Sequence, residues 1–437
     1  MWKPYIAQLA AIGCLGVAVP AFGQVAAPRP AGRISFFVNS ARLTSDSGPI
    51  RSNELVTTIT FGLPERSTNG LEYGIDLRQS QPVGSTRTSR LALYDGYVGA
   101  RFAGGAMRVR AGHMWLTDLG ALGSVAGGLF EYQRKTSSTA GRLRIGGFGG
   151  LEPNTYELGY AREVQKYGGY ALLEGAAGRR HVAGLIRIDH GGLAERSVVS
   201  VSNFVPVRAK VFLYQVLEYD LTGPAGQGSG GLTYFFLNAR ATVASRVELQ
   251  GLFNRGRSVD ARTITDDLLN GRTVSTVALD GLLYESAGAR VTVTVMPGVR
   301  VHGGYTRDRN NRDSDPTNRI YAGASAQNIA HSGVDLTFSG SQIQRPTGTY
   351  HSIYLSGGRQ IGRSVYVTAD YSSAVSIVRF TRMDGLTVET RPETRQIGGS
   401  AMINLNRRMS LFTTITRTLD ADTREMRMLS GLTFRLR

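Results

Sequence analysis

Pairs of arginines separated by one residue are the side chains in this sequence best suited to chemistry. Arg108 and Arg110 form one pair, and Arg142 and Arg144 form another. Residues two apart on a β-strand point to the same face, so each pair would present two guanidinium groups to one side of a sheet. A guanidinium binds phosphate, sulfate and carboxylate groups through parallel hydrogen bonds. The spacing therefore indicates a surface that attracts anions.

Other basic residues also fall on the polar faces of predicted strands. The whole set is Arg78, Arg108, Arg110, Arg142, Arg144, Arg187, Lys210, Arg240, Arg246 and Arg300. Carboxylates such as Glu72, Glu174 and Asp370 share these faces. Part of the positive charge could therefore serve only to pair with them and brace the sheet.

The net charge of +17 comes almost entirely from arginine. The sequence has 50 Lys and Arg against 33 Asp and Glu. Its lysines are Lys3, Lys135, Lys166 and Lys210. Such an excess of arginine suits recognition of anionic groups. A GC-rich genome would also favour arginine codons, so composition alone leaves the origin of the excess open.

Other kinds of chemistry find little support. The one cysteine, Cys14, lies within residues 1–23, which have the pattern of a cleaved leader. The chain that remains after cleavage would therefore have no disulfide, no thiolate metal site and no cysteine nucleophile. The six histidines are scattered without the spacing of metal ligands. There is no Gly-x-Ser-x-Gly motif. We expect no catalytic residues, no metal, no cofactor and no enzyme activity.

Residues 1–23 have the pattern of a secretory signal peptide. Lys3 supplies the positive start, residues 6–19 are apolar, and small residues precede a predicted cleavage site before Gln24. Residues 24–437 would then form the mature protein, as one domain.

Period-two alternation of apolar and polar residues follows the leader and continues along the chain. For example, Val365 and Val367 alternate with Tyr366 and Thr368. Each such segment would be a strand with one apolar and one polar face. The segments are about 10 residues long, as a tilted strand needs to cross a bilayer, whereas soluble strands average about 5–6 residues. No later run of 18 apolar residues predicts a transmembrane helix.

The predicted connections alternate between short and long. Tight turns are expected at 296–298, 361–363 and 406–408, and long polar loops at 256–274, 308–318 and 373–393. We expect no amphipathic helix and no second core. A meander of this kind fits a bilayer only if the sheet closes on itself.

The fold class predicted is all-β, a single-chain antiparallel transmembrane β-barrel. Twenty-three segments read as strands, and single-chain bacterial barrels favour an even number, so we predict about 22 strands, with a range of 18–24. The segment 33–42 and the region 91–134 are the least certain. Because strands begin near residue 33, no plug domain fits before the barrel.

The chain resembles the Gram-negative outer-membrane β-barrels of the porin type. The resemblance rests on the leader, the meander without cysteine, and the final strand. That strand places Met426, Met428, Leu432, Phe434 and Leu436 on one face, similar to the signal read by the barrel-insertion machinery. It departs from the pattern by ending on Arg437 rather than on an aromatic residue.

The resemblance implies export to the bacterial outer membrane and a set of partners. These are membrane lipid, lipopolysaccharide, the insertion machinery, and small, mainly anionic solutes or an acidic polysaccharide; nucleic acid is not expected. One loop of porin-like barrels often folds inward, and the Gly-rich stretch 113–128 is the candidate here. Its Trp115, Asp118, Leu119 and Leu122 would form the constriction. Alternatively, this is an ordinary loop beside a girdle tryptophan.

Three functions remain open at this point. The first is a passive channel for small solutes that prefers anions, because arginines would line the lumen. The second is an export conduit for an acidic exopolysaccharide. The third is a structural or adhesive barrel that its own loops close.

Overall fold

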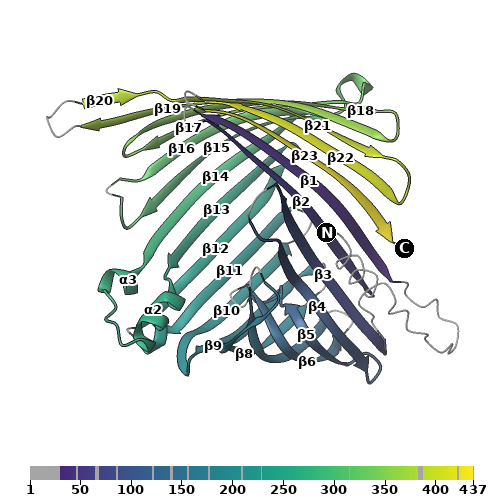
Figure 1. The fold of residues 1–437 in the computed structure, drawn as a ribbon, viewed down its shortest axis with the longest axis vertical. Coiled ribbons are helices and arrows are strands. Elements are labelled where there is room, and N and C mark those ends of the chain that lie inside the picture. Colours follow the sequence, from purple (N-terminus) through teal and green to yellow (C-terminus); the bar gives the residue numbers. More distant parts are fainter. Residues whose placement is uncertain are drawn as a thin grey trace.

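A computed structural model shows one antiparallel β-sheet that closes into a barrel (Figure 1). It describes residues 30–436, apart from 46–47, 64–67, 85–86, 121–122, 138–140, 155–156, 176–177, 208–209, 228, 314, 382–386 and 421–422. The predicted signal peptide lies outside the described residues. Successive strands of the meander pair with each other, and the first strand pairs with the last. The sheet therefore has no free edge.

The strands, apart from one short segment, are 9 to 17 residues long. They are β1 (Ala31–Ser45), β2 (Gly48–Leu63), β3 (Gly70–Val83), β4 (Arg90–Phe102), β5 (Met107–Trp115), β6 (Ser124–Ser137), β7 (Gly141–Pro153), β8 (Tyr160–Glu174), β9 (Arg180–His190), β10 (Leu193–Val207), β11 (Val211–Thr222), β12 (Ser229–Ala244), β13 (Val247–Ser258), β14 (Leu282–Met296), β15 (Val299–Asn310), β16 (Thr317–Ala326), β17 (Val334–Arg345), β18 (Gly348–Ile361), β19 (Val365–Thr381), β20 (Thr387–Thr390), β21 (Glu393–Asn404), β22 (Met409–Leu419) and β23 (Thr423–Leu436). Tilted strands of this length can span a bilayer.

The short segment β20 settles the strand number. Both β20 and β21 pair with β19, so together they occupy one position in the wall, interrupted around Pro392. The barrel therefore has 22 positions, as predicted from the sequence. The two doubtful regions are real strands, since β1 forms the closure with β23 and residues 91–134 contain β4 to β6. The described residues include no plug domain.

The two ends of the barrel differ. β1 begins and β23 finishes at one end, which we call the terminus end; the opposite end we call the loop end. Most turns at the terminus end are short, for example Pro297-Gly298 between β14 and β15, where Gly298 has a φ of 81°, although the connection 327–333 between β16 and β17 is longer and contains a one-turn helix. The loop end holds the long connection between β13 and β14. Short turns at the end of the termini and longer loops opposite are typical of outer-membrane barrels.

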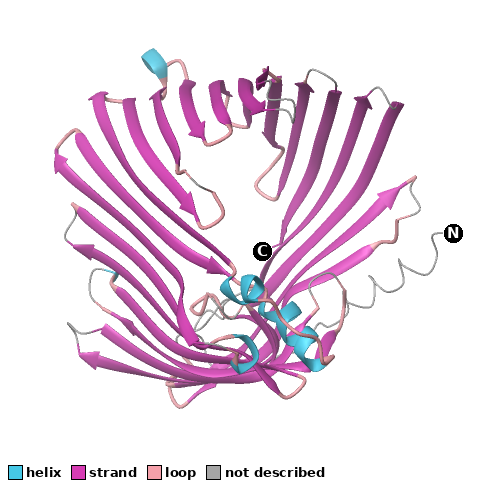
Figure 2. Ribbon diagram, turned by 90° about the vertical axis from the view of Figure 1, so that its left-hand side faces the viewer, coloured by secondary structure: helices cyan, strands magenta, loops and turns pink. Residues whose placement is uncertain are grey.

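Two helices lie in that long connection, α2 (Ala261–Leu269) and α3 (Thr276–Asp280) (Figure 2). The expectation that no helix interrupts the meander is therefore wrong here. Asp260 starts α2 by accepting a hydrogen bond from the backbone N–H of Thr263 at 3.0 Å. One-turn 3-10 helices occur at η2 (Pro224–Gly226) and η3 (Ile329–His331). None of the helices in the described residues is long and apolar enough to cross a membrane.

Candidate functional site

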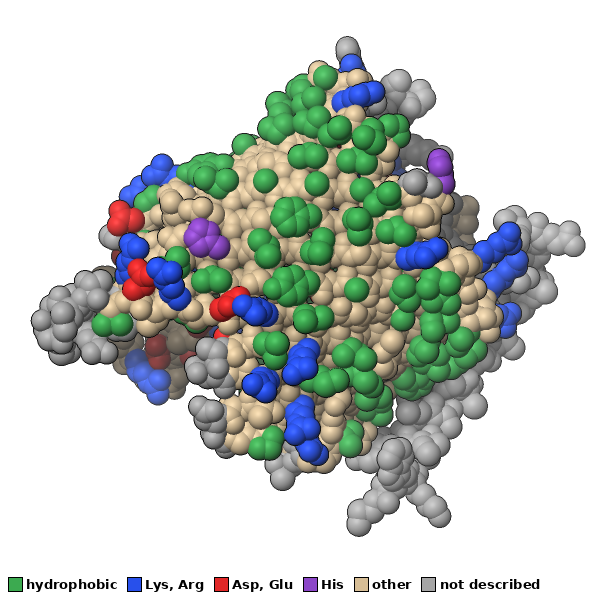
Figure 3. Space-filling model, turned by 90° about the horizontal axis from the view of Figure 1, so that it is seen from above, with side chains coloured by type: hydrophobic (Ala, Val, Ile, Leu, Met, Phe, Trp, Pro, Cys, Tyr) green, Lys and Arg blue, Asp and Glu red, His purple; other side chains and the backbone are tan. Residues whose placement is uncertain are grey.

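Alternation along β5 and β6 separates an inner from an outer face. Val109 and Phe130 are 41% and 46% exposed, whereas their neighbours Arg108 and Glu131 are only 5% and 2% exposed. Comparable rows of exposed apolar side chains cover the outside of the barrel (Figure 3). Arginine facing the lipid midplane would cost about 2–4 kcal/mol, so the charged face must point into the lumen.

The inner faces of β3 to β9 carry a network of arginines and carboxylates, which we call the ionic wall. At its centre, Arg108 donates to Glu72 and to Glu131, both at 2.6 Å. Arg110 also donates to Glu72, at 2.5 Å, and its guanidinium stacks over the ring of Tyr97 at 4.2 Å. One buried carboxylate of β3 thus joins two arginines on the inner face of β5.

The ionic wall continues across β6, β7 and β8. Arg144 contacts Glu131 at 3.2 Å and Glu174 at 3.5 Å. Arg142 also pairs with Glu174, and the hydroxyl of Tyr170 donates to Glu131. Each carboxylate therefore serves more than one donor. Breaking such a buried set by removing one member leaves an uncompensated charge, which is strongly destabilising.

The connection between β5 and β6 turns back into the lumen and covers part of this wall. Leu119, which is 1% exposed, lies so close to β9 that a Cβ added to Gly184 would be 2.6 Å from its side chain. Asp118 forms ion pairs with Arg144, at 3.9 Å, and with Arg180. We call residues 116–119 the inward segment. Its leucines complete an apolar cluster with inward residues of β5 to β10.

The predicted constriction residues therefore have different positions. Asp118 and Leu119 lie on the inner wall, as expected, although whether they limit passage stays a prediction. Trp115 is 55% exposed at the end of β5, on the same face as Val109, and points outward. Leu122 lies outside the described residues.

Seven of the ten predicted basic residues face the lumen. They are Arg78, Arg108, Arg110, Arg142, Arg144, Arg240 and Arg300. Arg108, Arg110, Arg142 and Arg144 are brought together in the ionic wall, whereas Arg240 lies apart and pairs with Glu248. Arg78 and Arg300 are exposed and have no ion pair in the described part of the chain.

Three of the ten predictions are wrong about position. Arg187 points outward, beside the exposed Leu185 on β9, where it pairs with Asp189 at 2.8 Å. Lys210 and Arg246 lie in the turns before β11 and before β13, at the terminus end rather than along a strand. The alternation placed these two on strand faces because it locates strand ends only within a few residues.

Several members of the ionic wall were not predicted from the sequence. Glu131, Arg101 and Arg180 were not among the predicted site residues. Arg101 approaches Glu72 at 3.8 Å in the buried part of the wall. Glu131 could have been found, because it lies between Phe130 and Tyr132 and must point to the face opposite to theirs.

No family model and no curated protein sequence matches this chain. Its fold resembles solved structures. OccAB2 of Acinetobacter baumannii gives a TM-score of 0.46 at 8% identity, covering 94% of this chain and 98% of that one. OccD3 (OpdP) of Pseudomonas aeruginosa gives 0.46 at 9% identity, covering 96% of both chains. OccK8 (OprE) of Pseudomonas aeruginosa gives 0.45 at 11% identity, covering 93% and 98%.

The wall of this chain identifies the fold without help from those likenesses. It closes through β1 and β23, turns an apolar face outward and keeps its charges inside. A sheet can span a bilayer only when it closes in this way. The chain has the fold of a porin-like outer-membrane β-barrel. The predicted fold class and its outer-membrane location are confirmed at this level.

At the loop end of this outer-membrane barrel, α2 is fastened to the rim. Arg262 donates to Glu195 of β10 at 2.6 Å and to Glu152 of β7 at 3.1 Å. His190 of β9 lies 3.4 Å from Asp266 of α2. The helix is thus held over one side of the mouth by side chains from three strands.

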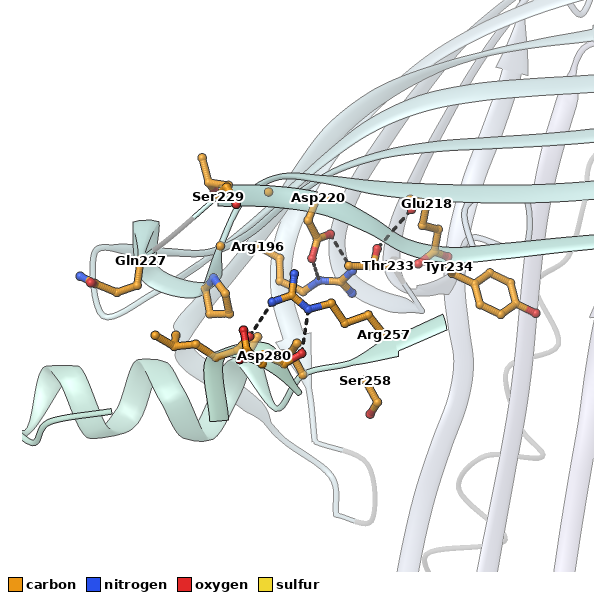
Figure 4. Close-up of a pocket in the computed structure, with 18 of the residues that line it drawn as sticks. Arg196, Glu218, Asp220, Gln227, Ser229, Thr233, Tyr234, Arg257, Ser258 and Asp280 are labelled. Atoms are coloured by element: carbon orange, nitrogen blue, oxygen red, sulfur yellow. Dashed lines mark hydrogen bonds and ion pairs between the residues drawn. The ribbon is translucent and has the colours of Figure 1, made fainter. Parts of the chain in front are cut away.

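Beside α3, a cavity of about 700 Å³ opens between the rim and Gly120, the residue that follows the inward segment (Figure 4). Arg196 donates to Asp220 at 2.8 Å. Arg257 donates to the backbone oxygens of Leu279, at 2.7 Å, and Asp280, at 2.9 Å. The mouth of the barrel therefore presents charges of both signs, unlike a simple funnel for anions.

Proposed function

We propose that this barrel is a passive channel for small solutes and that its lumen favours anions. The supporting observation is the charge balance of the ionic wall. Six arginines are joined by ion pairs to four carboxylates: Arg101, Arg108, Arg110, Arg142, Arg144 and Arg180 with Glu72, Asp118, Glu131 and Glu174. Among these described residues, the arginines outnumber the carboxylates by two. A lumen lined by an excess of one sign selects ions of the other sign.

Two of the predicted inward arginines, both exposed, would meet solutes directly. Arg78 lies on β3 and Arg300 lies on β15, far from it around the barrel. Neither forms an ion pair with a carboxylate in the described residues. In contrast, the arginines of the ionic wall are held in ion pairs, and Arg101 and Arg108 among them are buried, so they also stabilise the fold. Selectivity is therefore best tested at Arg78 and Arg300, where substitution leaves the buried network intact.

In this proposal, the inward segment narrows the lumen. It lies on the inner faces of β6 to β9 and is fixed there by the ion pairs of Asp118 and by the packing of Leu119. Solutes would pass between this side and the opposite wall, which carries hydroxyl groups such as those of Thr368 and Ser400, joined at 2.7 Å. The proposal assigns no catalytic role to any residue.

We also propose that residues 1–23 are removed as a signal peptide and that 24–437 form the mature barrel. Membrane lipid would surround its outer face, and the insertion machinery would read the outward residues of β23. Among these, Met426 and Met428 are exposed on the outside, as the resemblance implies.

The decisive experiment is planar-bilayer recording of the refolded protein, with the reversal potential measured in a salt gradient. We expect steady conductance and a preference for anions. The double variant Arg78→Gln with Arg300→Gln should lower that preference. Arg187→Gln is the matched control, because Arg187 faces outward and should not affect it.

The other outcomes decide between the remaining functions. A folded barrel without conductance would contradict the channel and favour a barrel closed by its loops or a plugged export conduit. Conductance with a cation preference would overturn the anion part of the proposal. An equal effect of Arg187→Gln would show that charge anywhere on the barrel, rather than in the lumen, sets the measured preference.

A further inference from the structure

Closure of the barrel gathers four arginines on its outer face. Arg417 of β22 lies opposite Met426 of β23, which lies opposite Arg42 of β1, which in turn lies opposite Arg51 of β2. Arg424 precedes Met426 by two residues in β23, so both lie on the same face. All four arginine side chains are exposed. We call these four residues the seam arginines.

Alternation shows that the seam arginines point away from the lumen. Arg42 shares its face of β1 with Phe36 and Val38, which are 43% and 47% exposed. Arg417 shares its face of β22 with the exposed Ile415. Directly opposite residues of neighbouring strands lie on the same side of a sheet, so Arg51 points outward with Arg42.

Their arrangement is electrostatically unfavourable without an anion. Arg42 and Arg51 are directly opposite each other, with Cα atoms about 5 Å apart, and like charges in such a pair are destabilising. Arg417 and Arg424 lie on the same outer face, offset from this pair. The side chains of the seam arginines form no ion pair or hydrogen bond in the part of the chain that the structure describes. Within that part they form a concentrated positive patch without a neutralising carboxylate.

Two other outward arginines near the loop end have carboxylate partners. Arg379 pairs with Glu389 at 2.9 Å, and Arg395 pairs with Glu393 at 2.7 Å. Some exposed arginines on the outside of this barrel therefore form ion pairs with carboxylates of the same sheet. Among the described residues, no carboxylate pairs with the seam arginines, so an anion from outside the chain can supply their counter-charge.

The residues around the seam arginines indicate what kind of molecule carries the anionic group. Toward the terminus end, the same outer faces carry apolar side chains, among them Met428 and the ring pair Phe36 and Phe434, whose centroids are 6.4 Å apart. The seam arginines lie nearer the turns at the loop end, where the strands leave the bilayer. A ligand that suits both surfaces has acyl chains below and an anionic headgroup above.

We propose that the seam arginines bind the phosphates of lipopolysaccharide in the outer leaflet. Arginine forms two parallel hydrogen bonds with a phosphate, and clusters of basic residues at a membrane surface attract anionic headgroups. The acyl chains lie along the apolar face of β22, β23, β1 and β2. Because residues on both sides of the β1–β23 pair form the site, it exists only after the barrel closes.

The test is binding of lipid A to the full barrel in detergent, compared with the same lipid A after removal of its phosphates. The variant combines Arg42→Gln, Arg51→Gln, Arg417→Gln and Arg424→Gln. We expect it to weaken binding of lipid A at least tenfold and to abolish the advantage of the phosphorylated form. The matched control combines Arg187→Gln, Arg379→Gln and Arg395→Gln and should change affinity less than twofold.

Two further measurements separate a loss of lipid A binding from a loss of folding and from a loss of channel activity. Heat-modified migration in a gel shows whether each variant is still a folded barrel. Conductance reports on the lumen, which the seam arginines do not line, so the channel and the lipid site can fail separately. Equal binding by the seam variant and the parent protein would overturn the proposal. So would equal binding of the two lipid A forms, or equal competition by vesicles of phosphatidylglycerol.

Discussion

Glu131 is the carboxylate on which the ionic wall depends most, and Glu131→Gln should destabilise the barrel strongly. The side chain is 2% exposed and accepts hydrogen bonds from Arg108 at 2.6 Å, from Arg144 at 3.2 Å and from the hydroxyl of Tyr170. Breaking one partner of a buried ion pair costs about 3–5 kcal/mol. Arg108 keeps Glu72 and Arg144 keeps Glu174, so we expect the lower end, about 3 kcal/mol.

The assay is equilibrium unfolding in urea, followed by the fluorescence of Trp115 and by gel migration of the folded barrel. Glu425→Gln is a suitable control, because Glu425 pairs with the exposed Arg427 at 2.6 Å, and exposed pairs contribute only about 0–1 kcal/mol. If both variants lost the same small amount, the ionic wall would not be a cooperative buried network. The argument that its arginines are structural would then be refuted.

Two further predictions concern the loop end. Asp118→Asn should loosen the inward segment, because it removes the charge that pairs with Arg144 and Arg180, and single-channel conductance should rise. Unchanged conductance would show that the segment does not limit passage. Hydrogen bonds from the backbone N–H and hydroxyl of Thr263 lower the pKa of Asp260 at the start of α2. The stabilisation, about 1 kcal/mol for a helix cap, should be complete above the ordinary aspartate pKa and be lost as pH falls through the lowered pKa. Hydrogen exchange of α2 across this pH range, compared with Asp260→Ala, tests it, since the variant should show no such dependence.

Much of the wall could be predicted because the information is local. Period two assigns a face to a residue from its immediate neighbours, so Arg108 and Arg142 were placed in the lumen correctly. The same rule failed for Arg187. It assumes that the apolar face of a strand meets lipid, but the inner face of β9 carries Val182, Ile186 and Ile188. These residues are apolar because the inward segment covers them, which is a long-range contact.

The ion pairs of the wall could not be predicted from the sequence as well as the face on which each residue lies. That Glu131 contacts both Arg108 and Arg144 depends on the registers of β5, β6 and β7, which alternation does not determine. The helix α2 was missed because the loop was judged by polarity. Its signals were present nonetheless: Asp260 at a capping position, followed by Ile264 and Leu268 at helical spacing.

The pairing of the first and last strands also determines when this protein can fold. The hydroxyl of Thr433 donates to that of Ser35, 398 positions away, at 3.0 Å. Contacts of such sequence separation require closing a very large loop before they stabilise anything, so they form late and slowly. Until β23 is in place, β1 and the newest strand would both be open edges, which invite pairing with other chains. We therefore expect the whole polypeptide to be kept unfolded by chaperones until synthesis is complete, since an incomplete wall has two open edges.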